Sequence, residues 1–196
     1  METHLNNLYL FRALEAYPYE LEKAVEALNY ALSYEPENIQ ALHLMGKVYS
    51  EQLKDYEVAK SYFENALALN IEATFIYPDY IMVFINNHDY DEAQKALDFA
   101  RGIKGIDKAL MELYQGYIYE AQQEYDAAKK ALKEAKQLSM NNDFSYYVDE
   151  VLARVDKKRK EKNTLERAKE QEEKKAQEKE NEASTNWFKN RLNGLL

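Results

Sequence analysis

The sequence predicts an all-α protein, an α-solenoid of about four helical hairpins. The first observation is that YDEAQKAL at residues 90–97 returns as YDAAKKAL at residues 125–132, while a looser copy, YEVAKSYF, occupies residues 56–63. The second is that apolar residues in each copy recur three or four positions apart, as a buried helix face requires. The third is that 196 residues contain only three prolines and five glycines, which favours long helices. A period of about 34 residues is typical of stacked hairpins.

The four hairpins follow one another along the chain. The first covers residues 5–38, the second 39–73 with one extra residue in its turn, the third 74–107 and the fourth 109–142. Each is expected to place small residues where its two helices approach to about 8–10 Å. These small residues are Gly46, Ala59, Ala93, Gly116 and Ala128.

This pattern resembles the tetratricopeptide repeat, whose unit of about 34 residues carries small and aromatic residues at set offsets. The third hairpin has Ile81 where the repeat has glycine, and the first has Arg12 and Glu15 in place of the glycine and tyrosine but keeps Leu8 and Phe11. The resemblance implies a right-handed solenoid and protein binding. The fourth hairpin matches best, through Gly116, Tyr119, Tyr125, Ala128, Leu132 and Ala135.

Helix ends are expected at several breaks. Pro18 and Pro36 lie between helices, and Gly102 and Gly105 follow a helix end, where left-handed caps prefer glycine. If Thr74 is an N-cap, Pro78 falls in the first helical turn, where its missing N–H costs no hydrogen bond.

The segment at residues 86–91, NNHDYD, resembles a calcium loop only superficially, because it lacks the required glycine and glutamate. We expect instead a turn in which Asp89 or Asp91 caps the next helix.

Composition changes at about residue 156. Residues 156–182 contain ten Lys or Arg and nine Asp or Glu, and the last 41 residues carry about +3 of a total charge of −9, which leaves about −12 on residues 1–155. We therefore predict a repeat domain at 1–155, a charged helical arm at 156–185 and a short amphipathic segment at 186–196. The domain should end in a capping helix with an apolar stripe of Phe144, Tyr147, Val148, Val151, Leu152 and Val155.

Several function classes are not indicated. The acidic charge argues against nucleic-acid binding, and the longest apolar run is far shorter than the roughly 20 residues of a membrane span. There are no cysteines, the three histidines have no second ligand at metal spacing, and no nucleotide-binding or hydrolase motif occurs. We therefore expect no enzyme activity, no catalytic residue, no cofactor and no metal, and a cytoplasmic location.

The resemblance also implies a binding surface, because the first helix of each repeat lines a concave groove. The residues carried over to that groove are Tyr9, His43, Lys47, Phe75, Met82, Leu110, Tyr117 and Glu120. One subfamily grips chaperone tails with Lys, Asn and Arg, but the matching positions here carry none of these. They are Tyr9, Ala13, Leu44, Phe75 and Asp79.

Two functions follow as hypotheses. The leading one is a non-enzymatic adaptor that binds a peptide or an amphipathic helix of a partner protein in an apolar groove. The alternative is a peripheral membrane or assembly factor anchored by the C-terminal amphipathic segment, which could also mediate self-association. The apolar residues of that segment are Trp187, Phe188, Leu192, Leu195 and Leu196, and the first four are the expected docking residues.

Overall fold

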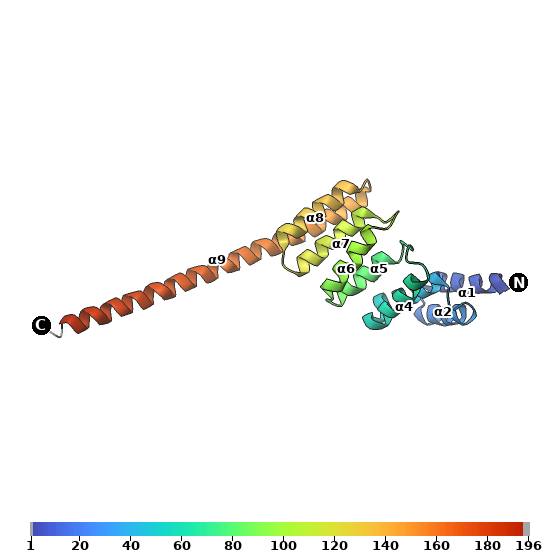
Figure 1. Ribbon diagram of the computed structural model, residues 1–196, viewed down its shortest axis with the longest axis horizontal. Helices are drawn as coiled ribbons and strands as arrows, with labels where there is room; N and C mark the ends of the chain where they lie inside the picture. The colour runs from blue at the N-terminus through green and yellow to red at the C-terminus, as the bar shows by residue number, and fades with distance from the viewer. Residues whose placement is uncertain (1, 194–196) are drawn as a thin grey trace. The chain divides into compact units, whose positions relative to one another are not determined.

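The computed structural model describes the chain at residues 2–193, with the side chains of residues 8–177 and Trp187. Within that range the regular elements are all helices (Figure 1). Eight of them form four hairpins: α1 (Glu2–Ala16) with α2 (Leu21–Tyr34), α3 (Ile39–Lys47) with α4 (Tyr56–Leu69), α5 (Tyr77–Asn86) with α6 (Tyr90–Arg101), and α7 (Lys108–Ala121) with α8 (Tyr125–Leu138).

Each hairpin also packs on the next one. The second helix of a hairpin contacts the first helix of its successor, in the pairs α2 with α3, α4 with α5 and α6 with α7. The predicted α-solenoid is therefore confirmed.

Two glycines allow the helices of a hairpin to approach closely. A Cβ atom on Gly46 would lie 2.5 Å from Cε1 of Phe63, and one on Gly116 would lie 2.7 Å from Cγ of Leu132. Phe63 and Leu132 are fully buried, so each glycine provides space for a large core side chain on the facing helix. Ala59, Ala93 and Ala128 are fully buried as well.

The turns inside three hairpins share one backbone geometry. Lys54, His88 and Gln123 all have positive φ, at 56°, 65° and 62°, and each lies two residues before the tyrosine that begins the next helix. The next residue then donates its N–H to a carbonyl of the preceding helix: Asp55 to Tyr49, Asp89 to Phe84 and Glu124 to Tyr119. The turn geometry thus repeats although the residue types differ.

The extra residue of the second hairpin is accommodated by a π-helix. In this hairpin the closing hydrogen bond spans six residues, from Asp55 to Tyr49, whereas it spans five in the other two. The last turns of the first helix widen accordingly into a π-helix, Val48–Leu53.

Some local predictions need correction. Helix α5 has Ile76 as its N-cap rather than Thr74, although Pro78 still lies in its first turn. Gly102 caps α6 with a right-handed φ of −79°, and only Gly105 has the expected positive φ, at 89°. Asp89 occupies the N-cap position of α6 without capping it, because its carboxylate accepts hydrogen bonds from Lys60 Nζ at 2.9 Å and Asn87 Nδ2 at 2.7 Å.

The first hairpin differs from the others in one respect. Leu8 and Phe11, which occupy apolar motif positions, are exposed. Leu10 and Ala13 are the residues by which α1 joins the buried core.

The chain divides into two compact units, Met1–Val148 and Asp149–Leu196. Helix α9 (Asn142–Asn193) is 52 residues long; it begins in the first unit, where Val148 is fully buried, and continues through the described part of the second. In the second unit Val151 and Val155 are buried, and nearly all described side chains beyond them are exposed. The predicted boundary at residue 155 stays a prediction. None of the described helices is long and apolar enough to cross a membrane.

Candidate protein-binding surface

The candidate surface lies on the first helices of the second, third and fourth hairpins and on the turn before α5, and is called the inner surface here. Its residues are His43, Lys47, Phe75, Asp79, Met82, Leu110 and Tyr117. Its polar centre joins α3 to α5. His43 Nε2 lies 2.7 Å from Asp79 Oδ2, and Lys47 Nζ lies 3.9 Å from the same oxygen and 3.4 Å from Glu51 Oε1. Because the Asp79 carboxylate faces both His43 and Lys47, consecutive repeats are linked through one acidic group.

Tyr17 extends this polar centre towards the first hairpin. Its hydroxyl donates a hydrogen bond to Glu51, and Lys47 Nζ lies 6.0 Å from the centre of its ring. Burial, followed by the hydrogen bond to Glu51, raises the pKa of Tyr17 above its ordinary value. The phenol therefore remains a neutral hydrogen-bond donor at physiological pH.

Phe75 supplies an exposed aromatic ring beside the polar centre. It lies in the turn before α5, is 47% exposed, and meets the His43 ring edge-on at a centroid distance of 5.1 Å. The centre of the His43 ring also lies 5.7 Å from that of Phe63 in the core. His43 thus packs against both a buried and an exposed aromatic ring, and it supports Phe75.

The tyrosines of α7 continue the inner surface. Tyr114 stacks on Tyr117 at 6.0 Å, and the Tyr117 hydroxyl lies 2.5 Å from that of Tyr147, near the start of α9. Burial raises the pKa of Tyr114. Met82 and Leu110 are half-buried, so this part of the surface offers mainly apolar and phenolic groups.

The structure brings some of the predicted groove residues together and separates others. His43, Lys47 and Phe75 form one cluster, whereas Tyr9 stacks on Tyr30 and Tyr34 of α2 at 5.1 and 5.8 Å. Glu120 is only 7% exposed, so the expectation that it lines an open groove is wrong.

The predicted C-terminal docking residues are only partly described. Trp187 is 58% exposed. The side chains of Phe188 and Leu192, and the whole of Leu195, lie outside the described residues. Among the residues that the structure does describe, no group of three His, Asp or Glu side chains is arranged to hold a metal ion.

Sequence reasoning missed the partners that organise the polar centre. Repeat offsets assign Asp79 only a chaperone-clamp position and assign no role to Tyr17 or Glu51. A usable signal existed, because Asp79 follows His43 by 36 residues, close to one repeat period. Residues so spaced fall on neighbouring first helices and can meet across the inner surface.

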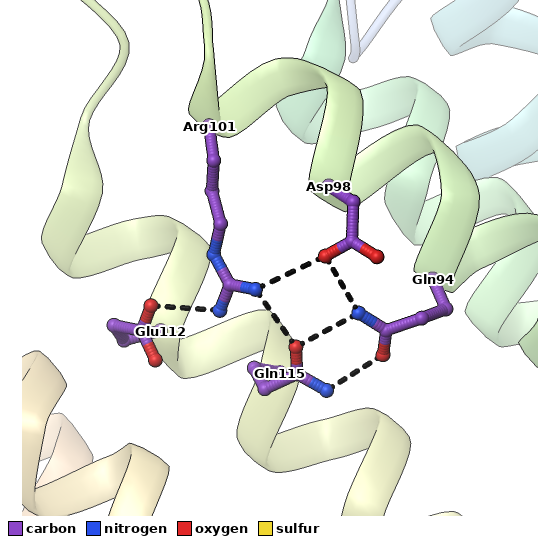
Figure 2. A network of polar contacts seen from close by, with 5 residues as sticks. All are labelled: Gln94, Asp98, Arg101, Glu112 and Gln115. Atoms are coloured by element: carbon purple, nitrogen blue, oxygen red, sulfur yellow. Dashed lines mark hydrogen bonds and ion pairs between the residues drawn. The ribbon is translucent and has the colours of Figure 1, made fainter.

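A second polar network connects the third and fourth hairpins (Figure 2). The amides of Gln94 and Gln115 bond reciprocally at 3.0 and 2.7 Å, and Arg101 donates to Gln115 at 3.1 Å and to Glu112 at 2.7 Å. Asp98 accepts from both Gln94 and Arg101. Gln115 is buried, so these bonds satisfy its amide and fix the register of α6 against α7.

Comparison with known proteins identifies the fold. No family model matches the chain, and no curated protein matches its sequence. Among solved structures, PilF of Pseudomonas aeruginosa is similar with a TM-score of 0.64 at 18% identity, over 82% of this chain and 77% of that one.

Structures of MamA are similar as well. MamA from Desulfovibrio magneticus RS-1 has a TM-score of 0.61 at 17% identity, over 83% of this chain and 96% of that one. Another MamA structure has a TM-score of 0.61 at 20% identity, over 88% and 94%. PilF and MamA are both tetratricopeptide-repeat proteins. This chain therefore has the fold of the tetratricopeptide-repeat solenoids.

Proposed function

We propose that this protein is a non-enzymatic, cytoplasmic adaptor that binds a segment of a partner protein on the inner surface. The observation that carries the proposal is the position of Phe75, a half-exposed aromatic ring supported by His43 next to the paired charges of Lys47 and Asp79. Exposed aromatic residues held in place by their neighbours are typical anchors of protein interfaces.

The chemistry of the inner surface suits an amphipathic segment. Phe75, Met82, Leu110 and Tyr117 offer apolar area, whereas His43, Lys47 and Asp79 offer both donors and an acceptor. A peptide or helix that carries apolar side chains on one side and polar groups at one end would satisfy both parts. The fold supports this function, since stacked repeats present an extended surface of this kind.

The experiment compares two phenylalanines of similar exposure. A partner is purified with the tagged full-length chain, identified, and its binding segment synthesised as a peptide. Replacing Phe75 with Ala should weaken binding of that peptide about tenfold or more, since truncating an interface anchor typically costs above about 1 kcal/mol. Phe99→Ala, at 52% exposure on α6, is the control and should leave binding unchanged. Equal losses in the two variants would contradict the proposal.

A second candidate function uses the C-terminal segment as an anchor. It is favoured by the exposure of Trp187, the only tryptophan, within a sequence that also carries Lys189 and Arg191. Tryptophan emission should shift to the blue with anionic vesicles if the segment binds membranes, or with rising protein concentration if it self-associates. Emission that responds to neither would reject this candidate.

A further inference from the structure

A groove between the first and second hairpins shares no lining residue with the inner surface. It has a volume of about 570 Å³ and lies between α2 and the end of the π-helix. All its lining residues belong to the unit that ends at Val148. None of them is a residue of the inner surface, so the groove can be assigned and tested separately.

Helix α2 forms the groove with two parallel rows of side chains. One row consists of Leu21, Val25, Asn29 and Ser33, and the other of Glu22, Glu26 and Tyr30. In both rows the spacing is four residues, which creates a ridge on a helix surface, with a furrow beside it that accepts the ridge of another helix. From residue 21 to residue 33 the rows extend about 18 Å, which is room for several turns of a partner helix.

Leu53 closes one side of the groove, and its residue type is unusual for its position. It directly precedes Lys54, the positive-φ residue of its turn, and the same position holds Asn87 and Gln122 in the third and fourth hairpins. Asn87 uses that position to donate hydrogen bonds to Glu57 and Asp89. Leu53 is instead an apolar side chain, 50% exposed, at the end of the widened π-helical turn.

The apolar side chains of the groove pack against the protein core. Leu21 and Val25 pack on the core cluster that includes Leu28 and Val48, and Tyr30 is held by stacking on Tyr9. The apolar side chains of the groove are therefore held in place by the core and by Tyr9, which reduces the entropy cost of binding.

The charge at the groove indicates what kind of partner fits. Glu22 and Glu26 are exposed along one row, and no Lys, Arg or His is among the residues that line the groove. The repeat domain as a whole is acidic, with about −12 on residues 1–155. A complementary partner would carry basic side chains next to its apolar ridge.

We propose that this α2 groove is a second protein-binding site, whose ligand is an amphipathic helix with apolar side chains four residues apart and Lys or Arg beside them. Its apolar ridge packs against Leu21, Val25 and Leu53, and its basic side chains face Glu22 and Glu26. Together with the inner surface, this site would let one chain hold two partner segments.

The test uses the full-length chain with ¹³C-labelled methyl groups and two synthetic probes. Both probes are alanine-based helices of about 18 residues with a pair of leucines four positions apart, a length at which such helices form in water. One carries lysines beside the leucines and its twin carries glutamates. Methyl shifts of Leu21, Val25 and Leu53 are followed as each probe is added to about 1 mM, a concentration that detects even weak binding.

The lysine probe should cause saturable shifts at these three methyl-bearing residues, and the glutamate probe should bind at least about tenfold more weakly. Leu53→Asn, which installs the residue of the third hairpin, should reduce binding of the lysine probe about tenfold. Leu69→Asn, at 42% exposure outside the groove, should not. Because Leu53 is half exposed, its replacement should leave the melting temperature unchanged, and Glu22→Lys with Glu26→Lys is a second variant that keeps the apolar groove intact.

Three results would overturn the inference. They are absence of shifts at Leu21, Val25 and Leu53 up to that concentration, equal binding of the two probes, or undiminished binding of the lysine probe to the charge-reversed variant. In the first case, shifts confined to residues near Phe75 would leave the proposed function of the inner surface standing.

Discussion

Replacing Gly46 with Ala tests how the second hairpin is packed. The new Cβ would lie 2.5, 2.8 and 2.9 Å from three atoms of the Phe63 ring, whereas carbon atoms in ordinary contact are about 3.5–4.0 Å apart. The ring would have to move by about 1 Å. Phe63 is fully buried and lies 6.3 Å from the ring of Tyr80 and 5.7 Å from that of His43, so there is little room for such a shift.

Two opposing effects determine the size of the change. Overpacking of a core typically costs about 1–3 kcal/mol, and the rigidity of this site favours the upper part of that range. Alanine in place of glycine inside a helix contributes about 1 kcal/mol of stability in return. We therefore expect Gly46→Ala to lower the free energy of unfolding by about 1–2 kcal/mol, which corresponds to a fall in melting temperature of about 2–8 °C for a chain of this size.

Thermal unfolding followed by circular dichroism measures the effect, with Gly102→Ala as the matched control. Gly102 has a φ of −79°, and its new Cβ would come no closer than 3.4 Å, to the carbonyl of Phe99. This control should be neutral or slightly stabilising. A double variant with Phe63→Leu should lose less stability than the sum of its single variants, because the smaller side chain leaves space for the Cβ. Equal melting temperatures for Gly46→Ala and Gly102→Ala would refute the assigned packing.

Four further predictions concern other parts of the fold. Ala128→Leu should lower the free energy of unfolding by about 1–3 kcal/mol, because Ala128 is fully buried, whereas Lys130→Leu on the exposed side of α8 should change it little. Equal effects of the two substitutions in urea unfolding would show that the helix register is wrong. Lys54→Gly should raise the free energy of unfolding by about 0.5–1 kcal/mol, because glycine adopts the φ of 56° without strain, whereas Lys54→Ala should not raise it. Stabilisation by alanine would argue against the left-handed turn. Hydrogen bonds from Asn87 and Lys60 lower the pKa of Asp89, so the stability that Asp89 contributes is present above the unfolded-state pKa of about 4 and is lost as the pH falls through the folded-state pKa. Asp89→Asn should therefore reduce the decline of the free energy of unfolding at acid pH, and an unchanged decline would contradict this. The fragment 1–155, which keeps the buried Val148, Val151 and Val155, should melt within about 2 °C of the full chain, and a larger drop would show that the fold requires the charged arm.

The sequence predicted the hairpins well because their close contacts depend on residue size. Gly46 and Gly116 mark positions where a larger side chain cannot fit, and such constraints are visible as a repeated pattern. The left-handed turns were not predicted, since Lys54, His88 and Gln123 share no side-chain property that favours positive φ. They follow from the closing hydrogen bonds of the hairpins, which only the backbone shows.

The candidate binding surface was less predictable than the fold. The offset rule found His43, Lys47 and Phe75, which lie together, but it also selected Glu120, which is buried. Burial of a polar residue depends on how neighbouring helices pack, and the repeat pattern carries no information on that point. The role of Asp79 depends on contacts between two repeats, which a residue-by-residue comparison with a single repeat cannot reveal.

The most direct test of the proposed adaptor function compares the inner surface with the α2 groove in one binding measurement. A segment of a purified partner protein is titrated into the full-length chain and into three variants, Phe75→Ala, Lys47→Ala and Leu53→Asn. If the inner surface binds this segment, the first two variants should weaken the affinity about tenfold each, and Leu53→Asn should bind as the unmodified chain does. Full affinity in both inner-surface variants would contradict the assignment of the binding surface.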